Sequence, residues 1–260
     1  MFEKIRELAE YRELLLTIAA REIKVRYKQS ILGIFWSILQ PLSMMIIFTI
    51  VFSRFIKVPS DGIPYPLFFY TALLPWTFFA TALSFAIPSL VSNSNLLSKI
   101  YFPREVFPIA SILAATVDFC IAALIFLAIL AFYKVVPNMN ALYIIPILSI
   151  QVLLTLAVSL FASAVNVYYR DVKYALPFFI QLWMYLSPVI YPVSAVPDEF
   201  KSIYMLNPMA PIINGYRQTL LIGTAPDFYH LAIAAFVTLT MLFLSYKYFK
   251  MVEMSFADRI

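Results

Sequence analysis

The fold follows from one uncharged stretch, VVPNMNALYIIPILSIQVLLTLAVSLFASAVNVYY, at Val135–Tyr169. A helix needs about 20 mostly apolar residues to cross the hydrocarbon core of a bilayer, and this stretch exceeds that length. Gln29–Ser53 and Tyr174–Pro197 also lack charged residues. These runs do not alternate as membrane strands do. Because backbone polar groups in lipid must be hydrogen-bonded within the protein, the runs predict transmembrane helices.

The composition supports a membrane protein. Hydrophobic residues make up 63% of the 260 residues and charged residues 13%, whereas soluble domains carry about 25% charged residues. One soluble core of this size could not bury so much apolar surface. Only four glycines occur, while aromatic residues reach 17%. This composition favours a helical bundle over an enzyme with a Gly-rich phosphate loop. The net charge of +5 is better explained by basic residues in cytoplasmic loops than by nucleic-acid binding.

We therefore predict an all-α integral membrane protein with six transmembrane helices. Residues 1–30 are expected to form a cytoplasmic N-terminus and residues 31–260 the six-span transmembrane domain. The partly apolar segment 192–226 is broken by Pro192, Pro197, Pro208 and Pro211, which predicts two short external re-entrant helices between spans five and six. The six spans are expected near residues 32–55, 67–88, 108–133, 142–167, 174–191 and 228–247.

The Lys and Arg residues predict the orientation. With the N-terminus in the cytoplasm, fourteen of the 19 basic residues fall in cytoplasmic segments. This bias, and the even number of spans, predicts that both termini are cytoplasmic. The N-terminus lacks an apolar segment with a cleavage site, so no removable signal peptide is expected.

The segment before the first span has the pattern of an amphipathic helix at the cytoplasmic interface. Leu16, Ala20, Ile23 and Tyr27 fall on one helical face, and charged residues fall on the others. The alternative is a basic flank that only sets topology. The interfacial helix is favoured because the apolar stripe continues over three turns.

The chain lacks the common catalytic motifs. It contains no G-x-x-x-x-G-K-[ST], H-E-x-x-H or G-x-S-x-G sequence. One histidine, His230, and one cysteine, Cys120, cannot form the usual zinc site. We therefore expect no catalytic residue, no metal and no P-loop ATPase on this chain. His230 is expected at the interface and Cys120 in apolar packing.

Asp118 is the one acidic residue well inside a predicted span. Such a carboxylate is a candidate functional group. It could pair with a basic residue, line a wet pathway, relay protons, or form a structural hydrogen bond to a neighbouring helix. Because a proton relay needs several such groups, the structural interpretation is favoured.

Four motifs carry a resemblance to a known family. They are REIKVRY at Arg21–Tyr27 (continuing through Ser30, Leu32-Gly33 and Trp36 to Pro41), NVYYRDV at Asn166–Val172, SPVIYP at Ser187–Pro192, and LNPM at Leu206–Met209. In this order, and at this chain length, they resemble type-2 ABC exporter permeases, in particular those that export lipid-linked O-antigen and related polysaccharides.

The resemblance implies a channel of two permease copies with two copies of a separate ATPase subunit, which would hold ATP and Mg. No cofactor is expected on this chain. The substrate would be a glycan on a polyprenyl diphosphate carrier, exported across the bacterial inner membrane, and the N-terminal helix would gate its entry. Teichoic acid exporters and small-molecule or drug exporters of the same superfamily are the alternatives. A membrane glycosyltransferase would need clustered acids or histidines, which are not found.

Three groups of residues become candidates. Aromatic rings offer flat faces to sugars, and the predicted channel residues are Trp36, Tyr70, Trp76, Trp183, Tyr185 and Tyr191; an interface belt with core packing is the alternative. Arg21, Arg26 and Lys28 could attract a diphosphate or simply anionic membrane lipids. The loop at about 92–107 would dock on the ATPase. The coupling candidates are Asn95, Leu96, Leu97, Lys99, Arg104, Arg170 and Asp171. An ordinary interfacial loop, and local pairing of Arg170 with Asp171, remain open as alternatives.

Overall fold

The computed structural model describes residues 10–28, 33–97 and 102–259, and its described residues form helices and no strand. Within these described ranges, five helical segments are long and apolar enough to cross a membrane. They are α3 Trp36–Phe48 with the π-helical η2 Thr49–Phe55, α4 Tyr65–Ala86, α7 Val106–Phe132, η3 Met139–Tyr143 with α8 Ile144–Tyr168, and α12 Phe228–Val252 with η6 Glu253–Ser255. Each lies within a few residues of a predicted span, except that the last extends further.

The predicted span at 174–191 differs. Helix α9, Val172–Tyr185, has 14 residues and is about 21 Å long, shorter than the ~30 Å hydrocarbon core. The helix stops before Ser187, and Pro188 and Pro192 lack the amide hydrogens that a continuing helix would need. The prediction of six spanning helices is therefore not confirmed, because only five described helices meet the length criterion.

Two short helices lie between α9 and α12, as the prolines predicted. They are α10 Asp198–Tyr204 and α11 Met209–Arg217, with short turns at η4 Val193–Ala195 and η5 Gln218–Ile222. Helix α11 is buried against α4, α8 and α12. Insertion of these helices into the outer leaflet stays a prediction.

The turn after η5 requires glycine. Gly223 has φ +76°, and a Cβ there would lie 2.8 Å from the side-chain amide nitrogen, Nδ2, of Asn138. The Gly223 carbonyl accepts hydrogen bonds from the side chains of Asn138 and Asn140, at 2.6 and 2.7 Å. This contact joins the start of the fourth predicted span to the segment before α12.

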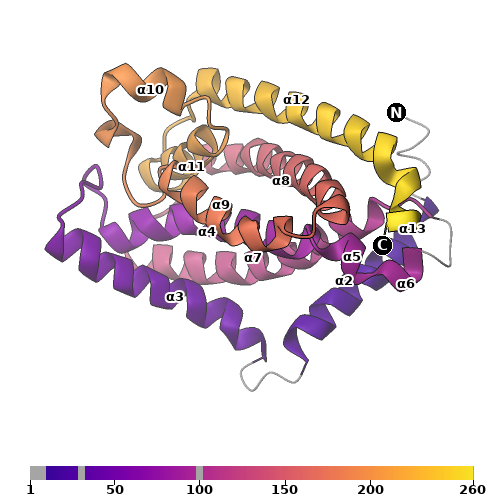
Figure 1. The fold of residues 1–260 in the computed structure, drawn as a ribbon. Coiled ribbons are helices and arrows are strands. Elements are labelled where there is room, and N and C mark those ends of the chain that lie inside the picture. The colour runs from indigo at the N-terminus through magenta and orange to yellow at the C-terminus, as the bar shows by residue number, and fades with distance from the viewer. Residues whose placement is uncertain (1–9, 29–32, 98–101, 260) are drawn as a thin grey trace.

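The helices form one elongated bundle with two distinct ends (Figure 1). Helices α3 and α12 lie at opposite edges, and α4 lies between them. In its most apolar window 78% of the α4 residues are buried, against 6% for α3 with η2, so α4 is the central helix. Helices α10 and α11 lie at one end, and α2 Arg12–Tyr27, α5 Ser89–Ser92, α6 Ser94–Leu97 and α13 Phe256–Arg259 lie at the other.

Helix α2 contacts the bundle through Ile18 and Ala19, which lie outside the predicted apolar stripe, and through Tyr27, which belongs to it. Ile18 and Ala19 are buried in a cluster with Phe107 of α7, whereas Leu16 is 61% exposed and Ala20 is exposed. The predicted stripe is therefore divided: Leu16 and Ala20 are exposed, whereas Ile23 is half-buried and the Tyr27 hydroxyl contacts Asp118 of α7. The interfacial position of α2 stays a prediction.

Candidate functional site

Asp118 of α7 meets two residues of α2. Its carboxylate forms an ion pair with Arg26 and accepts a hydrogen bond from the Tyr27 hydroxyl. The Arg26 guanidinium also lies 3.8 Å from the centre of the Phe85 ring, a cation–π contact. The side chains of Arg26 and Asp118 are 12% and 17% exposed. The intramembrane acid is thus paired with a basic residue, one of the alternatives that the sequence left open.

Two more polar contacts hold α2. Arg21 donates a hydrogen bond to the Asn93 side chain beside α5, and the Ser111 hydroxyl of α7 donates one to Glu22, at 2.9 Å. Burial raises the pKa of the Glu22 carboxyl, while the Ser111 hydrogen bond and Arg26 act in the opposite direction. Polar contacts from two successive turns therefore fix α2 on α7 and on Asn93 beside α5.

A cavity of about 280 Å³ lies between α2, α3, α4 and α7. Its lining includes the Arg26–Asp118 ion pair, Trp36 and Gln40 of α3, and Thr77 of α4. Trp36 is 51% exposed. Of the three cationic residues predicted at the interface, Arg26 reaches this cavity, while Arg21 bonds to Asn93 and Lys28 is exposed.

Two of the predicted channel aromatics lie in the core. Tyr70 is 1% exposed and its hydroxyl donates to the Ala122 carbonyl at 3.2 Å. Trp76 is 4% exposed and packs against Phe79. In this conformation neither ring presents a face on which a sugar could stack, so these two residues fit the core-packing alternative.

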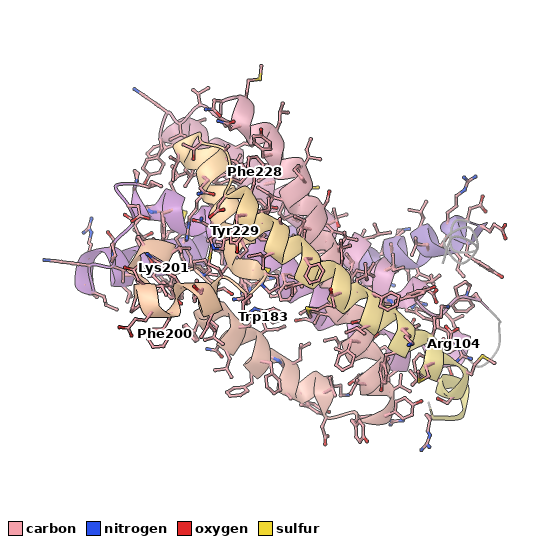
Figure 2. The ribbon with its side chains drawn as sticks, turned by 90° about the horizontal axis from the view of Figure 1, so that it is seen from above. Arg104, Trp183, Phe200, Lys201, Phe228 and Tyr229 are labelled. Atoms are coloured by element: carbon pink, nitrogen blue, oxygen red, sulfur yellow. The ribbon has the colours of Figure 1, made fainter. Side chains whose placement is uncertain are left out.

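Three further aromatics gather near the end of α9. The Trp183 indole donates to the Asn207 side chain at 2.8 Å, and Tyr191 donates to the Tyr185 carbonyl at 2.7 Å. Tyr185 is 48% exposed. Figure 2 shows Trp183 between the α10 end, marked by Phe200 and Lys201, and the opposite end, marked by Arg104. The six predicted aromatics therefore do not form one cluster, because Trp36 belongs to the separate cavity beside α2.

The predicted coupling residues lie at the α2 end. Asn95, Arg170 and Asp171 are exposed and Leu96 is half-buried. Leu97 is 6% exposed and packs in the chain's own core cluster, which leaves little of it for a partner. Arg104 stacks 5.8 Å from the Phe256 ring centre. Lys99 lies outside the described residues, and coupling to an ATPase stays a prediction for the whole group.

Arg217 is buried, although it lies in the segment 192–226 that was predicted to be external. It is 3% exposed, and its guanidinium lies 3.5 Å from the Phe68 ring centre. It donates to the carbonyls of Phe68 and Val189, at 3.3 and 2.9 Å, and more weakly to that of Tyr191, at 3.5 Å. This one side chain joins α4, the turn after α9, and α11. In the sequence, the only signal for this role was an arginine in a partly apolar segment broken by prolines.

Asn207 ties two of the sequence motifs together. Its amide donates to the Leu186 carbonyl and to the Ser187 hydroxyl, both at 2.9 Å. The LNPM motif therefore closes on the SPVIYP motif. In NVYYRDV, Asn166 donates to the Ile87 carbonyl at 3.3 Å and accepts from the Lys173 amide at 3.2 Å. These motif residues stabilise turns of the chain.

Within the described ranges, no three His, Cys, Asp or Glu residues lie close enough together to form a possible metal site.

Residues 13–221 match the ABC-2 type transporter family. The chain belongs to this family. This ABC-2 chain is 30% identical to an O-antigen export system permease protein RfbA of Myxococcus xanthus over 263 residues, which cover 100% of both chains. It is 29% identical to an RfbA protein of Klebsiella pneumoniae, covering 95% of this chain and 94% of the relative. A polysialic acid transport protein KpsM of Escherichia coli is 22% identical over 86% of this chain and 87% of the relative.

Family membership and the five long apolar helices make this ABC-2 chain a multi-pass membrane protein and a transport subunit. In that setting the Arg26–Asp118 pair gains importance. Ionisable residues inside a membrane protein are costly and commonly pair with one another or mark a pathway. The pair, its cavity and the Arg217 contacts are polar features of a largely apolar bundle that require explanation.

Proposed function

We propose that this chain is the permease of an ATP-driven exporter that moves a polysaccharide, as a lipid-linked glycan such as O-antigen, out across the bacterial inner membrane. The observation that carries this proposal is the similarity along the full length of both chains to a protein named as an O-antigen export permease. The second named transport protein, for polysialic acid, supports a polymer as the general substrate class.

The energy source in this proposal is a separate ATPase subunit, present in two copies and holding ATP and Mg. The chain itself has no P-loop sequence. The exposed residues Asn95, Arg170 and Asp171 supply polar surface at the α2 end, where such a partner would dock. ATP binding would shift the transporter between states through contacts that differ between them.

We also propose a sixth crossing, formed by α9 with the turn that follows it. In Figure 1 α2 and α13, near the two termini, lie at the same end of the bundle, which requires an even number of crossings. Five helices alone would leave them on opposite sides. This proposal keeps both termini cytoplasmic, residues 1–30 as the N-terminal region and residues 31–260 as the transmembrane domain.

The exposed face of α9 supports pairing with a second copy around the channel. Tyr174, Phe178 and Phe179 are 73%, 59% and 62% exposed, and such apolar side chains need lipid or protein around them. Helices α10 and α11 are proposed as external re-entrant helices. Burial of α11 against protein fits the rule that irregular backbone at membrane depth must be covered.

Deletion of the gene in its host tests the function. We expect lipid-linked glycan to accumulate inside the cell, and export to return with the wild-type chain. The purified permease should hydrolyse no ATP until an ATPase subunit is added. Normal glycan export in the deletion strain, combined with lost efflux of a small molecule, would favour the drug-exporter alternative. ATP hydrolysis by the permease alone would reject the division of labour.

A further inference from the structure

Two connections between the proposed crossings lie at the α2 end of the bundle. One joins α4 to α7 and contains α5 and α6, and the other joins α8 to α9 at residues 169–171. In the proposed topology both connections are cytoplasmic, and the chain has no P-loop sequence of its own. A separate ATPase must therefore act on the bundle through these connections or through the terminal segments.

The C-terminal segment, residues 249–259, contacts the first of these connections. The Lys250 ammonium donates to the carboxylate of Glu105, the residue directly before α7, at 2.9 Å, and also to that of Glu253 at 2.9 Å. The side chains of Lys250 and Glu105 are 14% and 5% exposed. This ion pair fixes the end of α12 against the start of α7, because separating the two charges would leave each of them buried without a partner.

Apolar packing strengthens the same contact. Phe256 of α13 is fully buried, in one cluster with Leu97 of α6 and Phe107 of α7. Its ring lies edge-to-face on that of Phe249, with the ring centres 5.4 Å apart. Helix α13 also contacts α6 directly. Because a closely packed interior transmits strain, a displacement of α6 would be passed on to the end of α12.

The same C-terminal segment contacts the second connection. The hydroxyls of Ser255 and Tyr168 are hydrogen-bonded, and Tyr168 is the last residue of α8. The Arg259 guanidinium lies 5.8 Å from the centre of the Tyr168 ring. Tyr168 is followed, after one residue, by the exposed Arg170 and Asp171. One segment of the chain therefore holds both connections, although they lie far apart in the sequence.

We propose that residues 249–259 form a C-terminal brace that makes the two cytoplasmic connections respond to the ATPase as one unit. This inference rests on the proposed function and assigns a coupling role to the C-terminal segment. Networks of packed side chains and ion pairs can carry energetic coupling between distant sites. Without the brace each connection would move separately, and less of the free energy of ATP hydrolysis would reach the spanning helices.

The amount of glycan transported per ATP hydrolysed measures this coupling. The complex of the permease with its ATPase is reconstituted in proteoliposomes, together with the lipid-linked glycan that accumulates in the deletion strain. Glycan protected from external periodate reports transport, and phosphate release reports hydrolysis. Lys250→Gln removes the ion pair with Glu105, and we expect the ratio to fall about fivefold or more, the lower end of typical coupling between sites.

Two lysine variants are the controls. Lys250→Arg keeps the positive charge and should restore most of the ratio. Lys201→Gln breaks an ion pair with Asp198 on α10, at the opposite end of the bundle, and should leave the ratio unchanged. An equal fall of the ratio in Lys201→Gln would overturn the proposal, because the effect would then not depend on the brace.

A merely structural role of Lys250 would give a different result. The substitution Lys250→Gln would then lower the amount of assembled complex, while each remaining complex would transport the normal amount of glycan per ATP. The ratio is therefore compared at equal amounts of complex. An unchanged ratio in Lys250→Gln refutes the coupling role.

Hydrogen exchange of the purified permease tests the brace without ATPase or glycan. Ser255→Ala removes one hydroxyl and keeps the test open if Lys250→Gln fails to fold. We expect backbone exchange to become about threefold faster or more, as for one lost hydrogen bond, in both 106–109 and 165–168. Ser149→Ala, whose hydroxyl donates to the Ile145 carbonyl on α8, should change neither segment. Faster exchange in 165–168 alone would show a local contact and contradict a shared brace.

Failure of the brace and failure of the proposed function are distinguishable. The deletion experiment above tests glycan export separately. A permease that exports glycan, but whose coupling ratio is unchanged in Lys250→Gln, refutes only the brace. If the deletion strain accumulates no glycan, the proposed function fails, and the hydrogen-exchange comparison alone decides whether the two connections are joined.

Discussion

Replacing Asp118 by Asn should destabilise the protein strongly, because Arg26 would keep its charge while losing its partner. The two side chains are 17% and 12% exposed, and removal of one member of a buried ion pair typically costs about 3–5 kcal/mol. That is more than a hundredfold change in the unfolding equilibrium, at ~1.4 kcal/mol per factor of ten. The Tyr27 hydroxyl also contacts this carboxylate, but it can still donate to the amide oxygen.

The assay is reversible unfolding of the purified permease in mixed micelles, followed by tryptophan fluorescence. Backbone hydrogen exchange in Arg12–Tyr27 adds a local measurement, and we expect this helix to exchange faster than in the wild type, because α2 loses its contact with α7. The matched control is Asp198→Asn, which breaks an ion pair with Lys201. The Asp198 side chain is 92% exposed. This variant should leave the unfolding midpoint unchanged.

A double variant decides whether the charge pair itself is responsible. Arg26→Met with Asp118→Leu removes both charges, and such apolar replacements of buried pairs are often neutral or stabilising. The double variant should therefore recover most of the stability that Asp118→Asn loses. The reasoning is refuted if Asp118→Asn unfolds like the wild type, or if the double variant is as unstable as the single one.

Three further predictions follow from buried or strained positions. Arg217→Lys should lower the free energy of unfolding by about 2–3 kcal/mol, because one ammonium group cannot reproduce the guanidinium contacts with the three carbonyls and the ring; Lys201→Arg, on the exposed α10, is the control, and an unchanged midpoint would argue against the clamp. Gly223→Ala should cost about 1–2 kcal/mol in the same assay, since φ is +76° and a Cβ would press on the Asn138 amide; a stabilised variant would contradict this. Burial raises the pKa of Glu22, so the wild type loses stability as pH rises above 4.5, the ordinary pKa of this carboxyl. Glu22→Gln lacks this loss, so thermal unfolding should show equal stability of the two proteins below that pH and an increasingly more stable Gln variant above it. A stability difference that does not change with pH would count against the argument.

The sequence by itself determined the class of fold and the position of five long helices. A bilayer demands about 20 apolar residues and internally paired backbone groups, so composition and length suffice to find them. The two short helices after α9 were also foreseeable, because prolines divide that segment locally. The end of α9 was not, since Leu186–Pro192 is as apolar as a span but turns, held by Asn207 and Arg217 from later in the chain.

Only the tertiary structure decided which polar groups meet. Arg26 and Asp118 are 92 positions apart, and Arg217 bonds across 149 positions to Phe68. No local periodicity encodes such pairs, because they depend on how whole helices pack. The same holds for the aromatics, which look alike in sequence: packing buries Tyr70 and Trp76 while Trp36 remains at an accessible cavity beside α2. In an apolar chain, burial alone distinguishes a core ring from a binding surface, and burial is a property of the folded bundle.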